Sequence, residues 1–199
     1  MPQIPVDAGL VVFLRLPEKG KVKTRLAATL GEEAALEIYK KLVSITLDIV
    51  IRSEIPTYLF YTDGLPPAST RDARFSYHIQ ADGDLGSRMA DALSFVLSLH
   101  QKALIIGSDC PGLTPEILHA GCRSLDETDI ILGPADDGGY YLVGCIELHP
   151  ALFANIKWST PSVLDQTIEK INEANLSYCL LEKLHDIDTA EDWNRFSGS

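Results

Sequence analysis

The stretch LVVFLRLPEKGKVKTRL, from Leu10 to Leu26, decides the fold class. Its first seven residues are apolar apart from Arg15, and such a run is typical of a central strand that is covered on both faces. The residues that follow, from Pro17 to Leu26, are expected to form a loop that contains Lys19, Lys21, Lys23 and Arg25, and we call them the basic segment. A buried strand that ends in a polar loop is typical of α/β domains, in which the loops at the strand ends bind ligands.

Apolar runs of strand length alternate with longer segments of helical period along the rest of the chain. Strands are expected at 57–62, 74–80, 103–108, 129–135, 140–145 and 177–182. Helices are expected at about 32–51, 85–99, 115–125 and 162–174, with a short terminal helix after DIDT. The strands around the turn DDGG are neighbours in sequence and should be antiparallel. This pattern predicts a single α/β domain over residues 1–199, with three layers, α/β/α, and a mixed, mostly parallel central sheet.

The composition is acidic, with 17 Lys and Arg residues against 28 Asp and Glu residues and a formal net charge of -11. A negative surface repels nucleic acid and anionic lipid, so neither nucleic acid nor a membrane is expected as a partner, and a small anion suits the basic segment better. No apolar run approaches the ~18 residues that span a bilayer, and the first residues, MPQIPVDAG, lack the features of a secretory leader. We therefore expect a cytoplasmic protein. The cysteines lack CxxC spacing, which argues against a zinc site or a disulfide framework.

The basic segment matches neither of two common phosphate-binding motifs. A P-loop requires GxxxxGK[ST], a dinucleotide-binding fold requires GxGxxG after the first strand, and the chain has neither at this position. What remains is a basic loop between a central strand and a helix whose amino end favours anions, and a di- or triphosphate fits that place. The predicted phosphate-binding residues are Lys21, Lys23, Arg25 and, on the first turn of a later helix, Arg88. The alternative is an ordinary solvated turn.

Two acidic residues are candidates for a metal site. Asp109 follows the apolar strand ALIIGS, and a carboxylate there can bind Mg²⁺ or Mn²⁺ together with phosphate oxygens and water. Asp188, in HDIDTAEDW, would share the ion if the strand before it brings it back to the same edge of the sheet. For Asp109 the alternative is a capping or turn-forming role.

The turn DDGG and a nearby tryptophan are candidates for substrate binding. Gly138 and Gly139 let the backbone approach a ligand closely, and Asp137 can contact a ligand hydroxyl or a cation. Trp158, in KWST, can stack on a sugar or a base. Each has a simpler alternative, because Asp and Gly dominate hairpin turns and a tryptophan is more often a core residue.

Six segments carry a resemblance to a known superfamily. They are KVKTRL, DGDLGSRM, GSDCPGLTPEIL, GPADDGGYYLVG, WSTPSVLDQT and DIDTAEDW, and they run in this order from Lys21 to Trp193. Together they resemble the nucleotide-diphospho-sugar transferase superfamily, whose GT-A fold is shared by glycosyltransferases and nucleotidyltransferases, and more closely a bacterial group of uncharacterised GT-A-like proteins. The chain departs from the superfamily in having only Gly20 before the basic residues and a single acid in SDCP.

The resemblance implies a metal-dependent glycosyltransferase that uses a nucleotide-diphosphate sugar donor, Mg²⁺ or Mn²⁺, and a small-molecule acceptor. Lys23 and Arg25 match residues that contact phosphates. Asp109 matches the acid that binds the metal, and Asp188 matches the acid that supplies a second metal contact. Asp137 is the candidate catalytic residue, as a general base or as the acid that orients the acceptor. The alternatives are a nucleotidyltransferase that joins a nucleoside triphosphate to a phosphorylated small molecule, and a catalytically idle nucleotide-binding module.

Overall fold

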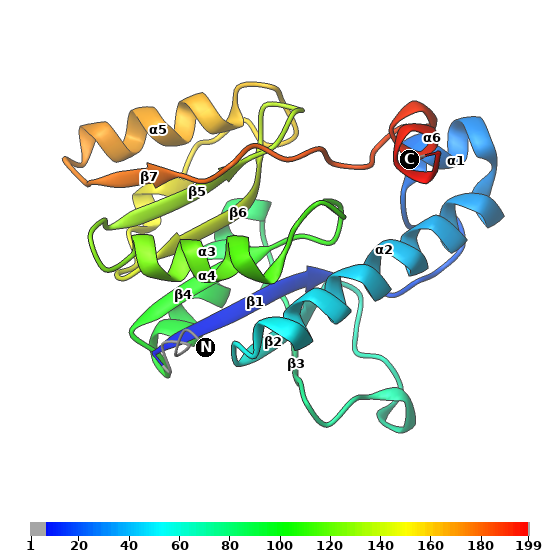
Figure 1. The fold of residues 1–199 in the computed structure, drawn as a ribbon, viewed down its shortest axis with the longest axis horizontal. Coiled ribbons are helices and arrows are strands. Elements are labelled where there is room, and N and C mark those ends of the chain that lie inside the picture. Colours follow the sequence, from blue (N-terminus) through cyan, green and yellow to red (C-terminus); the bar gives the residue numbers. More distant parts are fainter. Residues whose placement is uncertain (1–6, 199) are drawn as a thin grey trace.

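A sheet of seven strands forms the centre of the molecule in the computed structural model, which describes residues 7–198 (Figure 1). In chain order the strands are β1 (Ala8–Leu14), β2 (Thr57–Tyr61), β3 (Ser76–Ile79), β4 (Lys102–Ile106), β5 (Ile130–Pro134), β6 (Tyr140–Cys145) and β7 (Tyr178–Leu180). The α-helices are α1 (Thr24–Leu30), α2 (Glu32–Ser53), α3 (Leu85–Leu97), α4 (Pro115–Ser124), α5 (Val163–Glu173) and α6 (Ala190–Ser197). Short 3-10 helices lie at Ala68–Thr70 and Pro150–Phe153.

The sheet is mixed and mostly parallel. Its strand order is β3-β2-β1-β4-β6-β5-β7, and β6 pairs antiparallel with both β4 and β5, whereas the other neighbours pair in parallel. The β5–β6 pair flanks the turn DDGG, so the predicted antiparallel arrangement is confirmed. The order reverses at β1, because the chain first adds β2 and β3 on one side of it and then places β4 on the other. Ligands of open α/β sheets bind at such a reversal, beyond the carboxyl ends of the strands.

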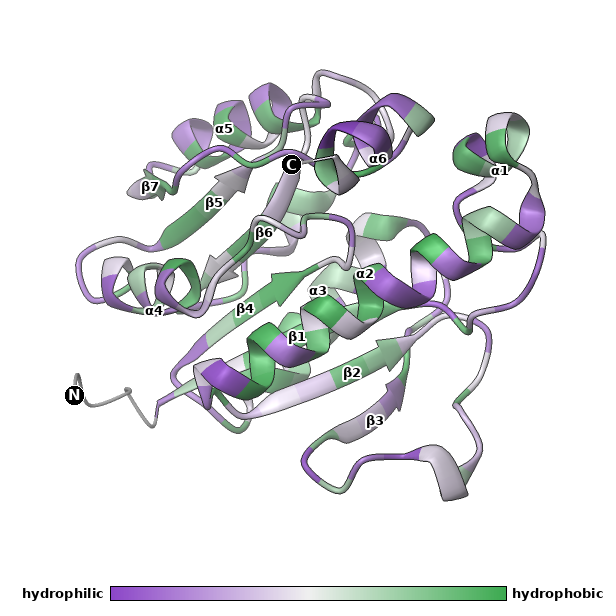
Figure 2. Cartoon of the chain, turned by 45° about the vertical axis from the view of Figure 1, so that its right-hand side comes forward, coloured by the Kyte–Doolittle hydropathy of each residue, from purple (hydrophilic) through white to green (hydrophobic). Residues whose placement is uncertain are grey.

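Helices cover both faces of the sheet, which confirms the predicted α/β/α layers. Successive side chains of a strand point to opposite faces, so the two faces of β1 meet different helices. Leu10, Val12 and Leu14 lie in the cluster that α2 and α4 cover, and Val11 lies in the cluster that α3 and α5 cover. Figure 2 shows the result, with β4 and β5 hydrophobic along most of their length and hydrophilic residues on the outside of α5.

The expectation of a loop from Pro17 to Leu26 is wrong for its last residues, because α1 begins at Thr24. This helix has seven residues, of which Leu26 is the buried one, so it shows no helical repeat of apolar residues in the sequence. Leu26 packs with Leu42 of α2 in a small cluster to which Trp193 of α6 also contributes. Helices α1 and α6 therefore lie side by side beyond the carboxyl end of β1 (Figure 1).

The strands at the two edges of the sheet are shorter than the sequence predicts. β3 covers Ser76–Ile79 within the expected 74–80, and β7 covers Tyr178–Leu180 within the expected 177–182. Both are edge strands, which have a neighbour on one side only to extend their pairing. No helix in the described part of the chain is long and apolar enough to cross a membrane. Residues 1–6, which contribute to the expectation of no secretory leader, lie outside the described residues.

Candidate functional site

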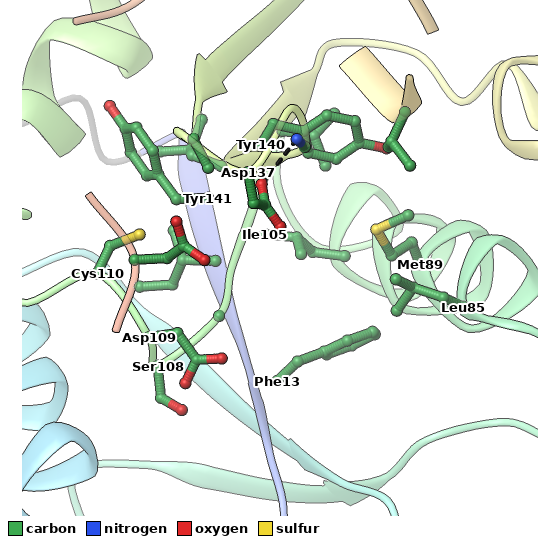
Figure 3. Close-up of a pocket in the computed structure, with 18 of the residues that line it drawn as sticks. Phe13, Leu85, Met89, Ile105, Ser108, Asp109, Cys110, Asp137, Tyr140 and Tyr141 are labelled. Carbon is green, nitrogen blue, oxygen red and sulfur yellow. Dashed lines mark hydrogen bonds between the residues drawn. The ribbon is translucent and has the colours of Figure 1, made fainter. Parts of the chain in front are cut away.

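A cavity of about 440 Å³ lies at the carboxyl ends of β1 and β4, where the strand order reverses (Figure 3). Leu85 and Met89 of α3 form one side of it, and Asp109 and Cys110, which follow β4, form the other. The turn between β5 and β6 contributes Asp137. We call this space the acidic cavity, because Asp109, Asp137, Asp186 and Asp188 all line it.

A second cavity, also of about 440 Å³, lies against the basic segment. We call it the basic cavity, because Arg15, Lys21, Lys23 and Arg25 line it. The two cavities adjoin, since they share a wall formed by Arg15, Tyr39, Asp109, Ser159 and Asp188. A ligand with an anionic end and a polar, uncharged end would find a suitable surface for each end.

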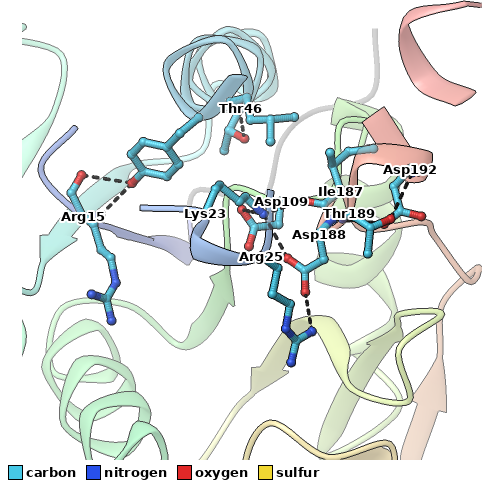
Figure 4. A network of polar contacts seen from close by, with 11 residues as sticks. Arg15, Lys23, Arg25, Thr46, Asp109, Ile187, Asp188, Thr189 and Asp192 are labelled. Atoms are coloured by element: carbon cyan, nitrogen blue, oxygen red, sulfur yellow. Dashed lines mark hydrogen bonds and ion pairs between the residues drawn. The ribbon is translucent and has the colours of Figure 1, made fainter. Parts of the chain in front are cut away.

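Lys23 lines the basic cavity beside the shared wall and binds three oxygen atoms (Figure 4). Its Nζ is 2.9 Å from Asp109 Oδ1 and 3.1 Å from Asp188 Oδ1, and it donates a hydrogen bond of 2.5 Å to Ile187 O. The side chain is only 6% exposed. Burial by itself would lower the pKa of Lys23, but the carboxylates of Asp109 and Asp188 outweigh burial and raise this pKa above its usual value. The ammonium group is therefore charged at neutral pH.

The segment 182–188, which we call the strap, leads from β7 towards α6 and brings Asp188 to Asp109. Its backbone is fixed at two points, because Leu184 N donates to Pro134 O at 3.0 Å and Ile187 N donates to Asp109 O at 2.8 Å. The sequence analysis expected Asp188 to share an ion with Asp109 if the strand before Asp188 returned it to the same edge of the sheet, and the structure brings the two carboxylates together around the ammonium group of Lys23.

Three carboxylates of the site, Asp188 among them, form a cluster. Oxygen atoms of Asp137, Asp186 and Asp188 all lie within 4.8 Å of one another. Burial raises the pKa of Asp186 to about 6, and the negative charges of Asp137 and Asp188 act in the same direction. Carboxylates at this separation repel one another, and a hard divalent cation, which prefers oxygen ligands, would relieve the repulsion.

Asp186 is a site residue that the sequence analysis missed. The spacing in Asp186-Ile187-Asp188 is a usable signal, because an extended segment points alternate side chains to the same side. Ile187 is 3% exposed and packs into the cluster of α1 and α2, and the acids on either side of it line the acidic cavity.

The turn DDGG has a different role at each glycine. Gly139 lines the acidic cavity, and its N–H donates to Asp137 Oδ1 at 2.8 Å. Gly138 has φ of +85°, and a Cβ added to it would lie 2.1 Å from Pro161 O. The sequence analysis predicted that a ligand approaches Gly138, but the backbone of this residue already packs directly against the segment before α5. This packing alone requires a glycine here.

The remaining predicted residues all lie at the two cavities. Trp158 and Arg88 line the acidic cavity, and Arg88 Nε donates to Gly83 O at 3.0 Å. Lys21 is exposed at the basic cavity and pairs with Glu18 at 2.6 Å. Arg25 Nη1 lies 3.3 Å from Asp188 Oδ2, so it approaches the same carboxylate as Lys23.

Two further features hold the site and were not foreseen from the sequence. The hydroxyl of Tyr39 accepts a hydrogen bond from Arg15 N at 2.8 Å and donates one to Arg15 O at 3.0 Å, which fixes the end of β1 in the shared wall. Asp136, beside Asp137, pairs with Lys183 at 2.9 Å and with His185, so it joins the DDGG turn to the strap.

Several solved structures have the same fold. The structure of a "putative nucleotide-diphospho-sugar transferase" from Desulfovibrio desulfuricans G20 superposes with a TM-score of 0.89 and 29% sequence identity, covering 96% of this chain and 86% of that one. Rv0371C of Mycobacterium tuberculosis H37Rv, solved in complex with manganese, gives 0.59 and 15%, covering 96% and 98%. CMP-2-keto-3-deoxy-manno-octonic acid synthetase in complex with CTP gives 0.59 and 10%, covering 96% and 97%. At these two lower identities the likeness shows the fold alone.

Family comparison places the chain among bacterial proteins. No curated protein matches its sequence. The model of the family described as "Uncharacterized protein conserved in bacteria (DUF2064)" matches residues 42–160, which is more than half of the 199 residues and includes Asp109 and Asp137. The structural similarity to the Desulfovibrio protein supports a transferase with the fold of the nucleotide-diphospho-sugar transferase superfamily. The chain therefore belongs to the DUF2064 family.

Proposed function

We propose that the protein is a metal-dependent glycosyltransferase that uses a nucleotide-diphosphate sugar as donor. The observation that carries the proposal is the wall shared by the two cavities, which places a group of cations directly beside a cluster of carboxylates. A nucleotide-diphosphate sugar has the matching form, with an anionic diphosphate on one side of the bond that breaks and a hydroxyl-rich sugar on the other.

The diphosphate would lie in the basic cavity. Arg15, Lys21 and Arg25 line it, and the charge of Lys23, which also lines it, adds to the positive potential. Negative charge develops on the leaving nucleoside diphosphate as the bond to the sugar breaks, so fixed cations favour the transition state over the bound donor.

The chemistry of the carboxylate cluster fits a divalent metal ion. Asp137, Asp186 and Asp188 offer oxygen ligands within 4.8 Å of one another, which suits Mg²⁺ or Mn²⁺. The structural relative Rv0371C was solved as a manganese complex, which is consistent with this choice. When bound, the ion would supply further positive charge next to the diphosphate.

The sugar and the acceptor would lie in the acidic cavity. Carboxylates accept hydrogen bonds from sugar hydroxyls, Gly139 leaves room for close approach at the turn, and the ring of Trp158 can stack on a sugar. Asp137 belongs to the carboxylate cluster and also lines this cavity, so it can complete the metal site or orient the acceptor hydroxyl as a general base. The two roles predict different effects of Asp137→Asn on metal affinity.

Nucleotidyl transfer is the second candidate, and the basic cavity, which would also suit the phosphates of a nucleoside triphosphate, favours it. Its acceptor, however, would be a phosphorylated small molecule, and a phosphate entering the acidic cavity would meet the carboxylates of Asp109, Asp137 and Asp186. Arg15 and Arg88 also line this cavity and offset part of the repulsion, but four carboxylates against two guanidinium groups favour an uncharged hydroxyl as acceptor and hence glycosyl transfer. A binding module without catalysis would retain nucleotide affinity and give no turnover.

The test begins with binding and ends with products. Calorimetry with nucleoside diphosphates, triphosphates and nucleotide sugars, in Mg²⁺, Mn²⁺ or chelator, should give metal-dependent binding of one nucleotide sugar. Turnover should release a nucleoside diphosphate, and release of pyrophosphate would instead establish nucleotidyl transfer.

Lys21→Ala provides a matched check of the basic cavity. It should weaken diphosphate binding, whereas Lys40→Ala should leave it unchanged, because Lys40 makes an equivalent pair with Glu37 at 2.7 Å but lines neither cavity. Equal effects of the two variants would reject a phosphate at the basic cavity.

A further inference from the structure

Lys23 is surrounded by the kind of oxygen atoms that usually bind a metal ion. An ammonium group has three N–H donors, and Asp109 Oδ1, Asp188 Oδ1 and Ile187 O take one each. Two carboxylates and a backbone carbonyl are also ligands that Mg²⁺ and Mn²⁺ accept. In the structure, Lys23 thus has no donor left for a phosphate, although the sequence analysis predicted that contact.

Lys23 and the carboxylate cluster together resemble a site that binds two cations, with Lys23 at one position and the cluster at the other. Asp188 connects the two positions, because it contacts Lys23 and also belongs to the cluster with Asp137 and Asp186. Four carboxylates lie within this part of the molecule, and the ammonium group of Lys23 together with the guanidinium group of Arg25, 3.3 Å from Asp188, balances only part of their charge. One divalent ion in the cluster would balance more of it.

We infer that Lys23 occupies the second cation position of the site, so that the protein binds one divalent metal ion and not two. The inference rests on the metal dependence proposed above and adds a role for Lys23 that the proposed function does not require. Lys23 then holds Asp109 and Asp188 in place while the cluster binds the ion, and Arg15, Lys21 and Arg25 remain to contact the phosphates.

The backbone at Lys23 supports a fixed position for this cation. Lys23 has φ of +49° and ψ of +51°, a left-handed conformation that is unfavourable for residues other than glycine and persists where the surroundings hold it. The next turn is anchored, since Ala27 N donates to Lys23 O at 2.9 Å and Leu26 is fully buried. A lysine held in this way is poorly placed to leave when a metal ion arrives.

The test is the number of Mn²⁺ ions bound by the full chain, measured by equilibrium dialysis and by calorimetry. The wild type should bind one ion. Lys23→Met removes the charge with little change in side-chain length, and this variant should bind two. Lys21→Met is the matched control, because Lys21 pairs with Glu18 and contacts none of the clustered carboxylates, and it should bind one.

Asp109 provides an independent check of where the second ion binds. Asp109→Asn in the wild-type background should still bind one Mn²⁺, because Asp109 is outside the cluster of Asp137, Asp186 and Asp188. The double variant Lys23→Met/Asp109→Asn should return from two ions to one, because the new position has lost a carboxylate. Circular dichroism and melting curves verify that each variant is folded, and Lys23→Gln replaces Lys23→Met if the latter does not fold.

The outcomes separate this inference from the proposed function. Two ions in the wild type, or one ion in a folded Lys23→Met protein, would overturn the inference and leave metal dependence intact. No ion in the wild type but one in Lys23→Met would overturn metal dependence and, with it, the one-ion stoichiometry of the inference. No ion in either protein would overturn both.

Discussion

Replacing Tyr39 with phenylalanine tests how the wall between the two cavities is held. The hydroxyl of Tyr39 makes hydrogen bonds of 2.8 Å and 3.0 Å to the N–H and the C=O of Arg15. Arg15 directly follows β1 and lines both cavities. Tyr39→Phe removes both hydrogen bonds but keeps the ring, which is 5% exposed and packs against Val22 and Leu36. The packing is therefore retained and the hydrogen bonds are tested alone.

We expect the free energy of unfolding to fall by about 1–2 kcal/mol. Each hydrogen bond contributes about 1 kcal/mol net, and water can satisfy part of the exposed backbone of Arg15 after the change. For a chain of this size about 1 kcal/mol lowers the melting temperature by about 2–4 °C. Tyr141→Phe is a suitable comparison, because its hydroxyl donates a hydrogen bond only to Glu182 O, at 2.9 Å, and this variant should lose about half as much.

Urea unfolding at pH 7 measures the loss directly. Burial raises the pKa of Tyr39 to about 12, so the hydroxyl is neutral and the difference from Phe should not change between pH 6 and pH 9. The freed Arg15 should also weaken diphosphate binding, which calorimetry detects. A loss below about 0.3 kcal/mol, or one no larger than that of Tyr141→Phe, would refute the claim that this hydroxyl fixes the end of β1.

Three further changes probe the acidic cavity and the DDGG turn beside it. Asp186→Asn should raise the melting temperature in chelator at pH 8 and raise it much less at pH 4.5. The pKa of Asp186 is about 6, so the ionised carboxylate destabilises the folded protein above this pH, whereas below it the folded protein already carries the neutral acid. An equal gain in melting temperature at both pH values would contradict this. Asp137→Asn should weaken Mn²⁺ binding by about tenfold or more if it is a ligand, and unchanged Mn²⁺ affinity with lost turnover would make it the general base instead. Gly138→Ala should destabilise the fold by at least about 2 kcal/mol, because its Cβ would lie 2.1 Å from Pro161 O. Gly64→Ala is the control, because Gly64 also has a positive φ, of +111°, but no atom lies within 4 Å of an added Cβ. This variant has the backbone strain without the clash and should lose less stability in the same melting experiment.

The sequence predicted the central part of the fold well because that part is buried on both faces. β1 and β4 are apolar throughout apart from Lys102, and the helices that cover them have a clear apolar repeat. The predictions of secondary structure failed where the apolar pattern is weak. α1 is too short to show a repeat, and it is stabilised by contacts of Leu26 with residues far away in the sequence, such as Ile187. The ends of β3 and β7 depend on the presence of a neighbouring strand, which the sequence of either strand does not encode.

The positions of the candidate site residues were partly predictable, and their contacts were not. Residues that follow parallel strands meet at one edge of the sheet, so the approach of Asp109 to the basic segment follows from topology. The contacts of Lys23 depend on its left-handed backbone and on the path of the strap. Neither leaves a local pattern in the sequence. Lys23 stands among basic residues in the sequence and was therefore predicted to bind phosphate, although in the structure its ammonium group pairs with the carboxylates of Asp109 and Asp188.

The acidity of the chain and its basic segment are connected through the strap. Asp186 and Asp188 lie next to Asp137, and their mutual repulsion opposes docking of the strap on the sheet edge. Contacts on either side offset it, because Lys23 binds Asp188, and Lys183 and His185 bind Asp136. The cations near the cluster thus do more than attract an anionic ligand. They allow several carboxylates to remain close together at the carboxyl end of the sheet, which is the arrangement that a divalent ion requires.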